Sequence, residues 1–190
     1  MSRPPAAREA VLDAFERIII AEGERAATLD ATAKAAGVSK GGLLYHFGSR
    51  HALIAGLIER LHRLVDADVD LIHSAQDGPI SYFVRSSVDL ESALDHSFVA
   101  TVRLAQGGDR QAAEAIGAVR SRWLVEIGRH VDDPSLALAI TLIGDGLYYH
   151  SALRAEVDLG ADEASDDIGR PEMDALVALL ERIAGESPVE

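Results

Sequence analysis

The chain has 190 residues and a mass of 20.2 kDa, which suits one compact domain or a small domain joined to a larger one. Its 48% hydrophobic and 26% charged residues exclude a wholly disordered, collagen-like or low-complexity chain. The absence of cysteine excludes disulfides, thiolate metal sites and a cysteine nucleophile. No apolar run approaches the ~20 residues that cross a bilayer, and residues 1–7 lack the apolar core of a signal peptide. We therefore expect a cytoplasmic protein without a membrane partner.

The charge is distributed unevenly along the chain, whose net charge is −13. Residues 1–50 carry seven basic and six acidic side chains, whereas residues 51–190 carry eleven and twenty-five. Both lysines, Lys34 and Lys40, lie between Arg25 and Arg50, where Asp30 is the one acidic residue. A basic patch on an acidic protein favours a face that contacts a polyanion such as nucleic acid, although four charges can also cluster by chance.

Apolar residues recur at helical spacing along the chain, and no segment alternates as a strand would. The six prolines all lie at the edges of these periodic segments, where a missing N–H costs least. The pattern predicts an all-α protein of about nine helices without an internal repeat. We expect the helices within residues 11–22, 29–36, 40–47, 50–74, 80–88, 94–106, 109–131, 134–149 and 171–184. The acidic stretch 156–170 is expected to be a solvated linker, with cation binding as the less favoured alternative.

Two short predicted helices are joined by Gly37, Val38 and Ser39, in the layout of a helix-turn-helix. Thr28, Ser39 and Ser49 are the expected N-caps of the second, third and fourth helices. The glycines Gly41 and Gly42 are unusual in the third helix, because each costs ~1 kcal/mol relative to alanine in a helix interior. We interpret them as positions that let the backbone approach another surface.

The side chains of the third predicted helix divide into two groups. Leu43 and Phe47 are four residues apart and are expected to face inward. Lys40, Leu44, Tyr45 and His46 would project outward, where they suit phosphate oxygens and base edges in a major groove. The alternative is a small helical corner that tolerates its glycines.

Residues 27–50, ATLDATAKAAGVSKGGLLYHFGSR, closely resemble the DNA-binding motif of the TetR family of transcriptional regulators. The resemblance covers about the first 60 residues, and Leu44 stands where many members have tyrosine. It implies a homodimer on a palindromic operator in double-stranded DNA, with a helix-turn-helix domain at 1–50 and a helical effector-binding and dimerisation domain at 51–190, linked by a helix at about 49–74. The predicted DNA-binding residues are Thr28, Ser39, Lys40, Gly41, Gly42, Leu44, Tyr45, His46 and Arg50.

The region after residue 78 contains aromatic side chains on several predicted helices, and these could line a cavity for a small-molecule effector. An ordinary core is the alternative for any one of them. Asp145 interrupts an otherwise apolar helix and must therefore face solvent, a partner or a ligand. The predicted ligand-binding residues are Phe83, Phe98, Arg103, Trp123, Asp145, Tyr148 and Tyr149.

The last two predicted helices carry long apolar stripes, and Ala139, Gly144 and Gly146 would allow another helix to approach closely. We expect the helix at 134–149 to be buried on more than one side and a homodimer to form through these two helices.

His51, His62 and His73 recur every eleven residues, a spacing too long for one metal centre, so we expect solvent-facing histidines and neither a metal nor a cofactor. No catalytic motif is recognised. The sequence thus predicts a non-enzymatic, ligand-responsive DNA-binding regulator, most simply a repressor released from its operator by a small molecule. The alternatives are a helical enzyme that acts on a small molecule and a protein-interaction module, each with a vestigial helix-turn-helix.

Overall fold

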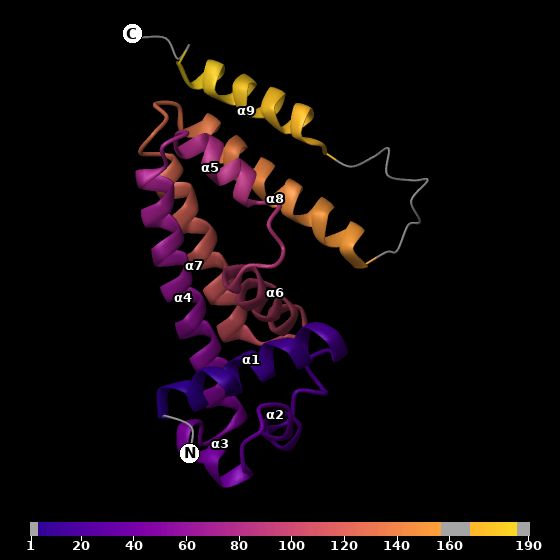
Figure 1. The fold of residues 1–190 in the computed structure, drawn as a ribbon. Coiled ribbons are helices and arrows are strands. Elements are labelled where there is room, and N and C mark those ends of the chain that lie inside the picture. Colours follow the sequence, from indigo (N-terminus) through magenta and orange to yellow (C-terminus); the bar gives the residue numbers. More distant parts are fainter. Residues whose placement is uncertain (1–3, 157–167, 186–190) are drawn as a thin grey trace. The chain divides into compact units, whose positions relative to one another are not determined.

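The computed structural model describes residues 4–156 and 168–185. This described part forms nine α-helices and no strand, which confirms the predicted all-α class (Figure 1). The helices are α1 (Pro4–Glu22), α2 (Leu29–Ala35), α3 (Lys40–His46), α4 (Arg50–Ser74), α5 (Pro79–Ser86), α6 (Ala93–Gln106), α7 (Arg110–Ile127), α8 (Pro134–Glu156) and α9 (Arg170–Gly185). The central part of the predicted acidic linker, residues 157–167, lies outside the described residues. None of the helices described is both long and apolar enough to cross a bilayer.

The predicted N-caps are confirmed. The hydroxyl of Thr28 accepts a hydrogen bond from the Ala31 N–H at 3.1 Å, and that of Ser39 accepts one from Gly42 at 3.0 Å. Ser49 does the same for Ala52 at 3.1 Å. Each bond satisfies one of the N–H groups that a helix start leaves free, and a cap of this kind is worth about 1 kcal/mol. The caps therefore fix where α2, α3 and α4 begin.

Contacts divide the described residues into two compact units. The first unit comprises residues up to Asp66 together with Glu91–Val119, and the second comprises Ala67–Leu90 together with residues from Arg120 onward. Both α4 and α7 contribute residues to each unit. These contact-based units do not test the predicted boundary between a DNA-binding domain at 1–50 and an effector-binding domain at 51–190, which stays a prediction.

The core of the first unit lies between α1, α2, α3 and the first half of α4. It is completed by Ala100 and Leu104 of α6 and by Ala112 and Ala115 of α7. Phe47 is buried at the end of α3, and its ring lies against Gly56 of α4. A Cβ atom at position 56 would be only 2.5 Å from Cε1 of Phe47, so no larger residue fits unless the ring moves. The guanidinium of Arg8 lies 5.3 Å from the centre of the same ring. Phe47 thereby holds the end of α3 to the rest of the unit.

The first unit also buries the carboxylate of Glu16 on α1. This carboxylate accepts a hydrogen bond from the hydroxyl of Ser97 on α6 at 2.5 Å. Arg60 lies 3.7 Å from the other carboxylate oxygen of Glu16 and also pairs with Asp13. Burial raises the pKa of Glu16, and the Ser97 hydrogen bond and the Arg60 charge offset that effect only in part.

The core of the second unit is built from the end of α4 with α5, α7, α8 and α9. Gly144 of α8 packs against the ring of Phe83 on α5, where an added Cβ would be 2.6 Å from Cε1. The close approach of another helix that the sequence predicts at Gly144 is therefore made by α5 of the same chain, so this position is not available to a partner copy. Ala139 and Gly146 remain exposed.

The expectation that α8 is buried on more than one side is not met within the single chain. Leu136, Ile140 and Leu147 are buried on one side. The opposite side exposes Leu138, Leu142 and Tyr149, and α9 likewise exposes Leu179 and Ile183. These five side chains form what we term the α8 and α9 apolar stripes.

Candidate functional site

The turn between α2 and α3 has a defined hydrogen-bonded geometry. Gly37 has φ of +68°, a left-handed conformation that favours glycine. The N–H of Gly37 donates to the Lys34 carbonyl at 3.2 Å, and the N–H of Val38 donates to the Ala33 carbonyl at 3.0 Å. These two bonds close the end of α2 as a Schellman motif. The chain leaves α2 in a fixed direction, and Ser39 at once begins α3.

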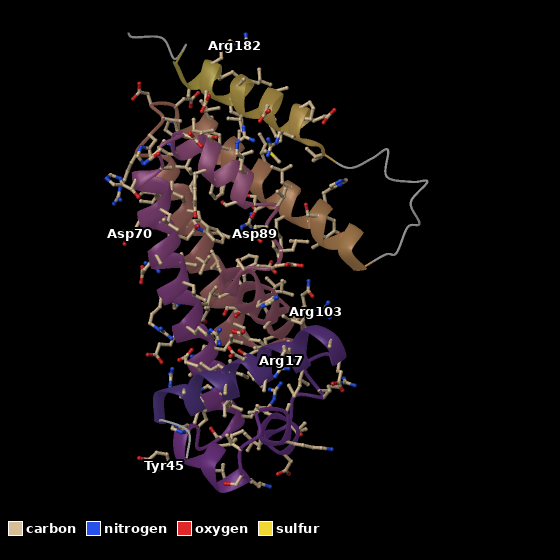
Figure 2. The ribbon with its side chains drawn as sticks, in the orientation of Figure 1. Arg17, Tyr45, Asp70, Asp89, Arg103 and Arg182 are labelled. Carbon is tan, nitrogen blue, oxygen red and sulfur yellow. The ribbon has the colours of Figure 1, made fainter. Side chains whose placement is uncertain are left out.

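The two faces of α3 differ as the sequence predicts. Leu43 and Phe47 are buried in the core of the first unit. Tyr45 is 83% exposed, and Leu44 is also exposed. Figure 2 shows the Tyr45 side chain extending away from α3. An aromatic side chain so little buried contributes almost nothing to the fold, so its place on the surface needs another explanation.

The glycines of α3 have different surroundings. A Cβ added at Gly41 would meet only the Ser39 hydroxyl, at 4.0 Å. At Gly42 it would lie 3.2 Å from that hydroxyl, which caps the helix through the Gly42 N–H. The fold therefore has a reason to keep Gly42 small, whereas Gly41 is open to solvent. Gly41 shares its side of the helix with Tyr45, four residues further on.

Two basic side chains of this region, those of Lys40 and Arg50, have partners within the chain. Lys40 forms an ion pair with Asp30 at the start of α2, with Nζ 2.9 Å from Oδ1, and both side chains are exposed. Arg50 donates from Nη2 to the backbone carbonyl of Glu24 at 3.1 Å and lies 3.7 Å from the Glu24 carboxylate. The Lys40 pair is a solvent-exposed contact that a phosphate can replace, whereas the Arg50 contact also fixes the loop after α1.

Among the other predicted DNA-binding residues, Thr28 and Ser39 use their hydroxyls as N-caps. The ring of His46 lies edge-on to that of Tyr45, with centres 5.2 Å apart. All nine predicted residues thus lie on or beside α2, α3 and the start of α4, in the first unit. That they contact DNA stays a prediction.

The predicted ligand-binding residues do not all fall in one unit. Phe98 and Arg103 are on α6 in the first unit, while the remaining five are in the second. There, Phe83 and Trp123 lie edge to face, with ring centres 6.3 Å apart. Asp145 pairs with Arg120, which accounts for a carboxylate on an apolar helix. Tyr148 is partly buried and Tyr149 is exposed on α8. Their role toward a ligand stays a prediction.

Sequence reasoning missed Asp68 of α4, which is hydrogen-bonded to an aromatic side chain of α7 and to another of α5. Asp68 accepts hydrogen bonds from Nε1 of Trp123 at 2.9 Å and from the hydroxyl of Tyr82 at 3.2 Å. Burial raises the pKa of Asp68, and burial together with the Asp68 charge raises that of Tyr82 to about 12. No sequence motif marks Asp68, because its partners are 14 and 55 residues away.

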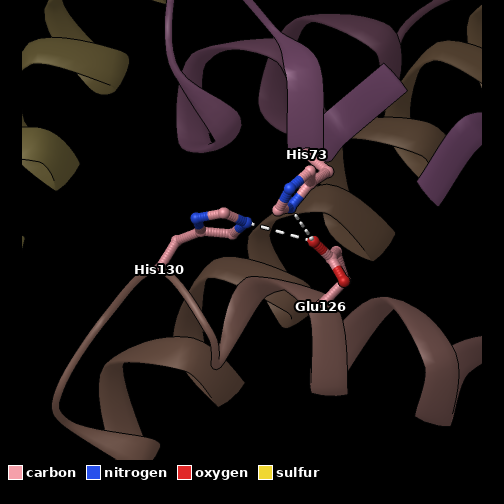
Figure 3. A group of neighbouring side chains, drawn as sticks. All are labelled: His73, Glu126 and His130. Atoms are coloured by element: carbon pink, nitrogen blue, oxygen red, sulfur yellow. Dashed lines mark hydrogen bonds and ion pairs between the residues drawn. The ribbon is translucent and has the colours of Figure 1, made fainter. Parts of the chain in front are cut away.

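A second cluster in the same unit was also missed. His73 of α4, Glu126 of α7 and His130 just after α7 lie together (Figure 3). Nδ1 of His73 is 3.4 Å and Nε2 of His130 is 3.1 Å from the same carboxylate oxygen, Oε1 of Glu126. Arg129 donates to the other oxygen, Oε2, at 2.6 Å. Burial favours a higher pKa for Glu126, but the hydrogen bonds from His130 and Arg129 and their charges outweigh it and lower the pKa. The four-residue spacing of Glu126 and His130 was the one sequence signal of this cluster.

Comparison with known proteins agrees with the geometry of α2 and α3. The family described as "Bacterial regulatory proteins, tetR family" matches residues 11–57. The protein named "Uncharacterized HTH-type transcriptional regulator TtgW", from Pseudomonas putida, is 31% identical over 121 residues, which are 54% of this chain and 87% of TtgW. The regulator AlkX of Mycobacterium tuberculosis is 33% identical over 91 residues, 43% of each chain, so the match spans less than half of AlkX.

Solved structures share the whole fold. SCO7518 of Streptomyces coelicolor A3(2) superposes with a TM-score of 0.66 at 22% identity, covering 95% of this chain and 99% of that one. The multidrug binding protein EbrR, solved with malachite green, gives 0.62 at 20% identity, covering 96% and 98%. The all-α fold of the described residues and the helix-turn-helix formed by α2 and α3 define the class of protein as a bacterial regulatory protein. The chain belongs to the TetR family of transcriptional regulators.

Proposed function

We propose that the chain is a homodimeric, effector-responsive regulator that binds a palindromic operator through α3. The observation that supports this most directly is the composition of the exposed face of α3, which carries Lys40, Gly41, Leu44 and Tyr45. It offers a cation for phosphate, a site without a side chain for close approach, and apolar and phenolic groups for base edges. The buried Leu43 and Phe47 hold this face rigidly on the first unit.

A second copy of the chain is the partner we propose for the α8 and α9 apolar stripes. A monomer would leave Leu138, Leu142, Tyr149, Leu179 and Ile183 in water. Burying such side chains against a symmetric copy gains about 25 cal/mol for each Å² of apolar surface removed from water. Two copies would also present two α3 helices, as a two-fold symmetric operator requires.

The proposed effector is a small molecule bound in the second unit. Phe83, Trp123 and the Asp68 carboxylate combine aromatic surface with a partly buried acceptor, which is the composition of a ligand site. EbrR, of the same fold, binds malachite green, a precedent for small-molecule binding by this architecture. An effector that binds one state of the dimer more tightly than the other lowers or raises operator affinity by that difference. Release of a repressor is the outcome we expect.

The test is fluorescence anisotropy of labelled DNA from upstream of the chain's own coding region, at several salt concentrations. We expect saturable binding that weakens as salt rises, because local cations such as Lys40 would release counterions from the phosphates they contact, while the net charge of −13 keeps non-specific affinity low. Tyr45→Ala should weaken binding, whereas Arg110→Ala, which removes an exposed charge at the start of α7, should leave it unchanged. Turnover of a bound compound without DNA binding would instead support the alternative function, that of a helical enzyme acting on a small molecule. A regulator of this kind acts in the cytoplasm.

The effector can be sought with the protein's own fluorescence, since Trp123 is its single tryptophan. A compound bound near Trp123 should change its emission and also shift the anisotropy of the protein–DNA complex. Compounds that alter the emission of Trp123 without altering DNA binding would contradict a regulatory role for this site.

A further inference from the structure

We propose that His73, Glu126 and His130 form a binding site for a late first-row divalent cation, with Zn²⁺ as its representative. The three residues supply two imidazole nitrogens and one carboxylate oxygen, the donor types that Zn²⁺ and its neighbours prefer over Mg²⁺ or Ca²⁺. The site belongs to the second unit alone and is independent of the proposed DNA-binding function.

The spacing of the donor atoms suits a tetrahedral ion. Zn²⁺ binds nitrogen and oxygen at about 2.0–2.1 Å, so two ligands of one tetrahedral centre lie about 3.3–3.4 Å apart. The observed separations from Oε1 of Glu126 are 3.4 Å to His73 and 3.1 Å to His130. All three donor atoms lie within 4.8 Å of one another. The side chain of His73 is 71% exposed and can therefore rotate to adjust the third distance, the one between the His73 and His130 nitrogens.

The backbone positions of the three ligands are fixed by the core. Each ligand is adjacent in sequence to a buried residue of the same apolar cluster: Ile72 precedes His73, Ile127 follows Glu126, and Val131 follows His130. A site on anchored backbone loses little conformational entropy when it binds an ion. The ligand atoms are thus held near their working positions by packing that exists without the ion.

The Glu126 carboxylate is also buried and oriented in a way that suits a ligand of a cation. The Glu126 side chain is only 2% exposed, and a buried carboxylate needs a cation or hydrogen bonds to offset its lost hydration. Arg129 holds Oε2, which leaves Oε1 as the oxygen that both imidazoles face. An outer partner that fixes a ligating carboxylate in this way is typical of metal sites. The exposed side of His73 leaves room for water as a fourth ligand.

The experiment is calorimetric titration of the tag-free, full-length protein with Zn²⁺, supported by the visible absorption of Co²⁺ as a reporter of tetrahedral coordination. We expect one Zn²⁺ per chain and no comparable binding of Mg²⁺. His73→Ala and His130→Ala should each weaken Zn²⁺ binding more than about 100-fold, beyond the roughly 10–100-fold that loss of an outer partner costs. His51→Ala, which removes an exposed histidine of the same helix, is the matched control and should bind as the wild type does.

His73→Ala is the decisive variant, since the exposed side chain of His73 contributes little to folding. Circular dichroism shows whether His130→Ala and Glu126→Gln, which change more buried side chains, are still folded. Equal Zn²⁺ affinity of the wild type and His73→Ala would overturn the proposal. So would a wild type that binds no Zn²⁺ at one per chain, or a loss in His51→Ala as large as that in His73→Ala.

Discussion

Lys40 at the start of α3 and Asp30 at the start of α2 form an ion pair with 2.9 Å between Nζ and Oδ1, on the face proposed to meet DNA. Exposed pairs of this kind contribute about 0–1 kcal/mol to stability. The lysine can therefore exchange its carboxylate for a DNA phosphate at little cost. Asp30 thus competes with DNA for the main cation of α3.

Asp30→Asn should strengthen DNA binding severalfold at low salt, because it frees Lys40 and removes a charge that repels phosphate. Lys40→Ala should weaken binding on all sequences. It should also flatten the salt dependence by about 0.9 for each phosphate that is no longer neutralised, hence about 1.8 for a dimer. Anisotropy titrations over a salt series measure both effects, with Arg110→Ala as the charge-matched control. An unchanged slope in Lys40→Ala would show that Lys40 does not contact phosphate.

Gly41→Ala should separate stability from DNA binding. Alanine favours a helix over glycine by up to about 1 kcal/mol, and the added methyl meets no close neighbour, so the midpoint of thermal unfolding should stay level or rise. DNA affinity should fall by the roughly 1–3 kcal/mol that a good base contact is worth, since the methyl intrudes where the backbone approaches DNA. Wild-type DNA affinity in a stabilised Gly41→Ala would disprove close approach at this position.

Tyr45→Ala should leave thermal stability unchanged, because the side chain is 83% exposed. We expect it to change the order of preference among operator variants as well as the affinity, as befits a contact to base edges. A binding assay across single-base variants of the operator makes the comparison. Uniform weakening on every variant would assign Tyr45 to the phosphate backbone instead.

Glu16→Gln should raise stability at neutral pH relative to the wild type. Burial places the pKa of Glu16 above its unfolded value of about 4.5, so the folded state binds the proton more tightly. The stability that this group contributes is fully present below that unfolded value and is lost as pH rises through the folded pKa. Urea unfolding of both proteins, from about pH 4 to about pH 8, should show the wild type becoming less stable relative to the variant as pH rises. A constant difference would refute a raised pKa.

Leu142→Asp should convert the proposed dimer into monomers, since it puts a charge into the α8 apolar stripe. Leu71→Asp is the matched control: the two leucines are 52% and 53% exposed in the single chain, but Leu71 is on α4, outside the stripes. Sedimentation or light scattering gives the masses. Monomeric wild type, or equal dissociation in both variants, would exclude the stripe as the interface.

Sequence periodicity predicted the order and approximate positions of the helices of the described residues and the caps of α2, α3 and α4, because these depend on neighbours within four residues. It placed two ends wrongly, since α1 begins at Pro4 and not near residue 11, and α8 continues to Glu156 and does not end near residue 149. Thr28, Ser39 and Ser49 bond N–H groups three positions on, and Leu43 and Phe47 share one helical face, so local pattern was sufficient. The TetR motif and the exposed face of α3 followed from the same short range. Even Gly37 could be assigned to the turn from the residues around it.

Long-range contacts could not be obtained in this way. The sequence predicts that a helix approaches Gly144 closely but not which one, and the structure shows that it is the helix of Phe83, 61 positions earlier in the numbering. The sequence relates His73 only to histidines of its own helix and predicts that it faces solvent, whereas folding places this exposed side chain beside Glu126 and His130 of another segment. A helix face is set by local geometry, but which side chains meet across helices depends on packing of the whole chain. The sequence alone therefore determined the helices, the family motif and the exposed face of α3, and tertiary packing alone decided the Asp68 contacts and the His73–Glu126–His130 cluster.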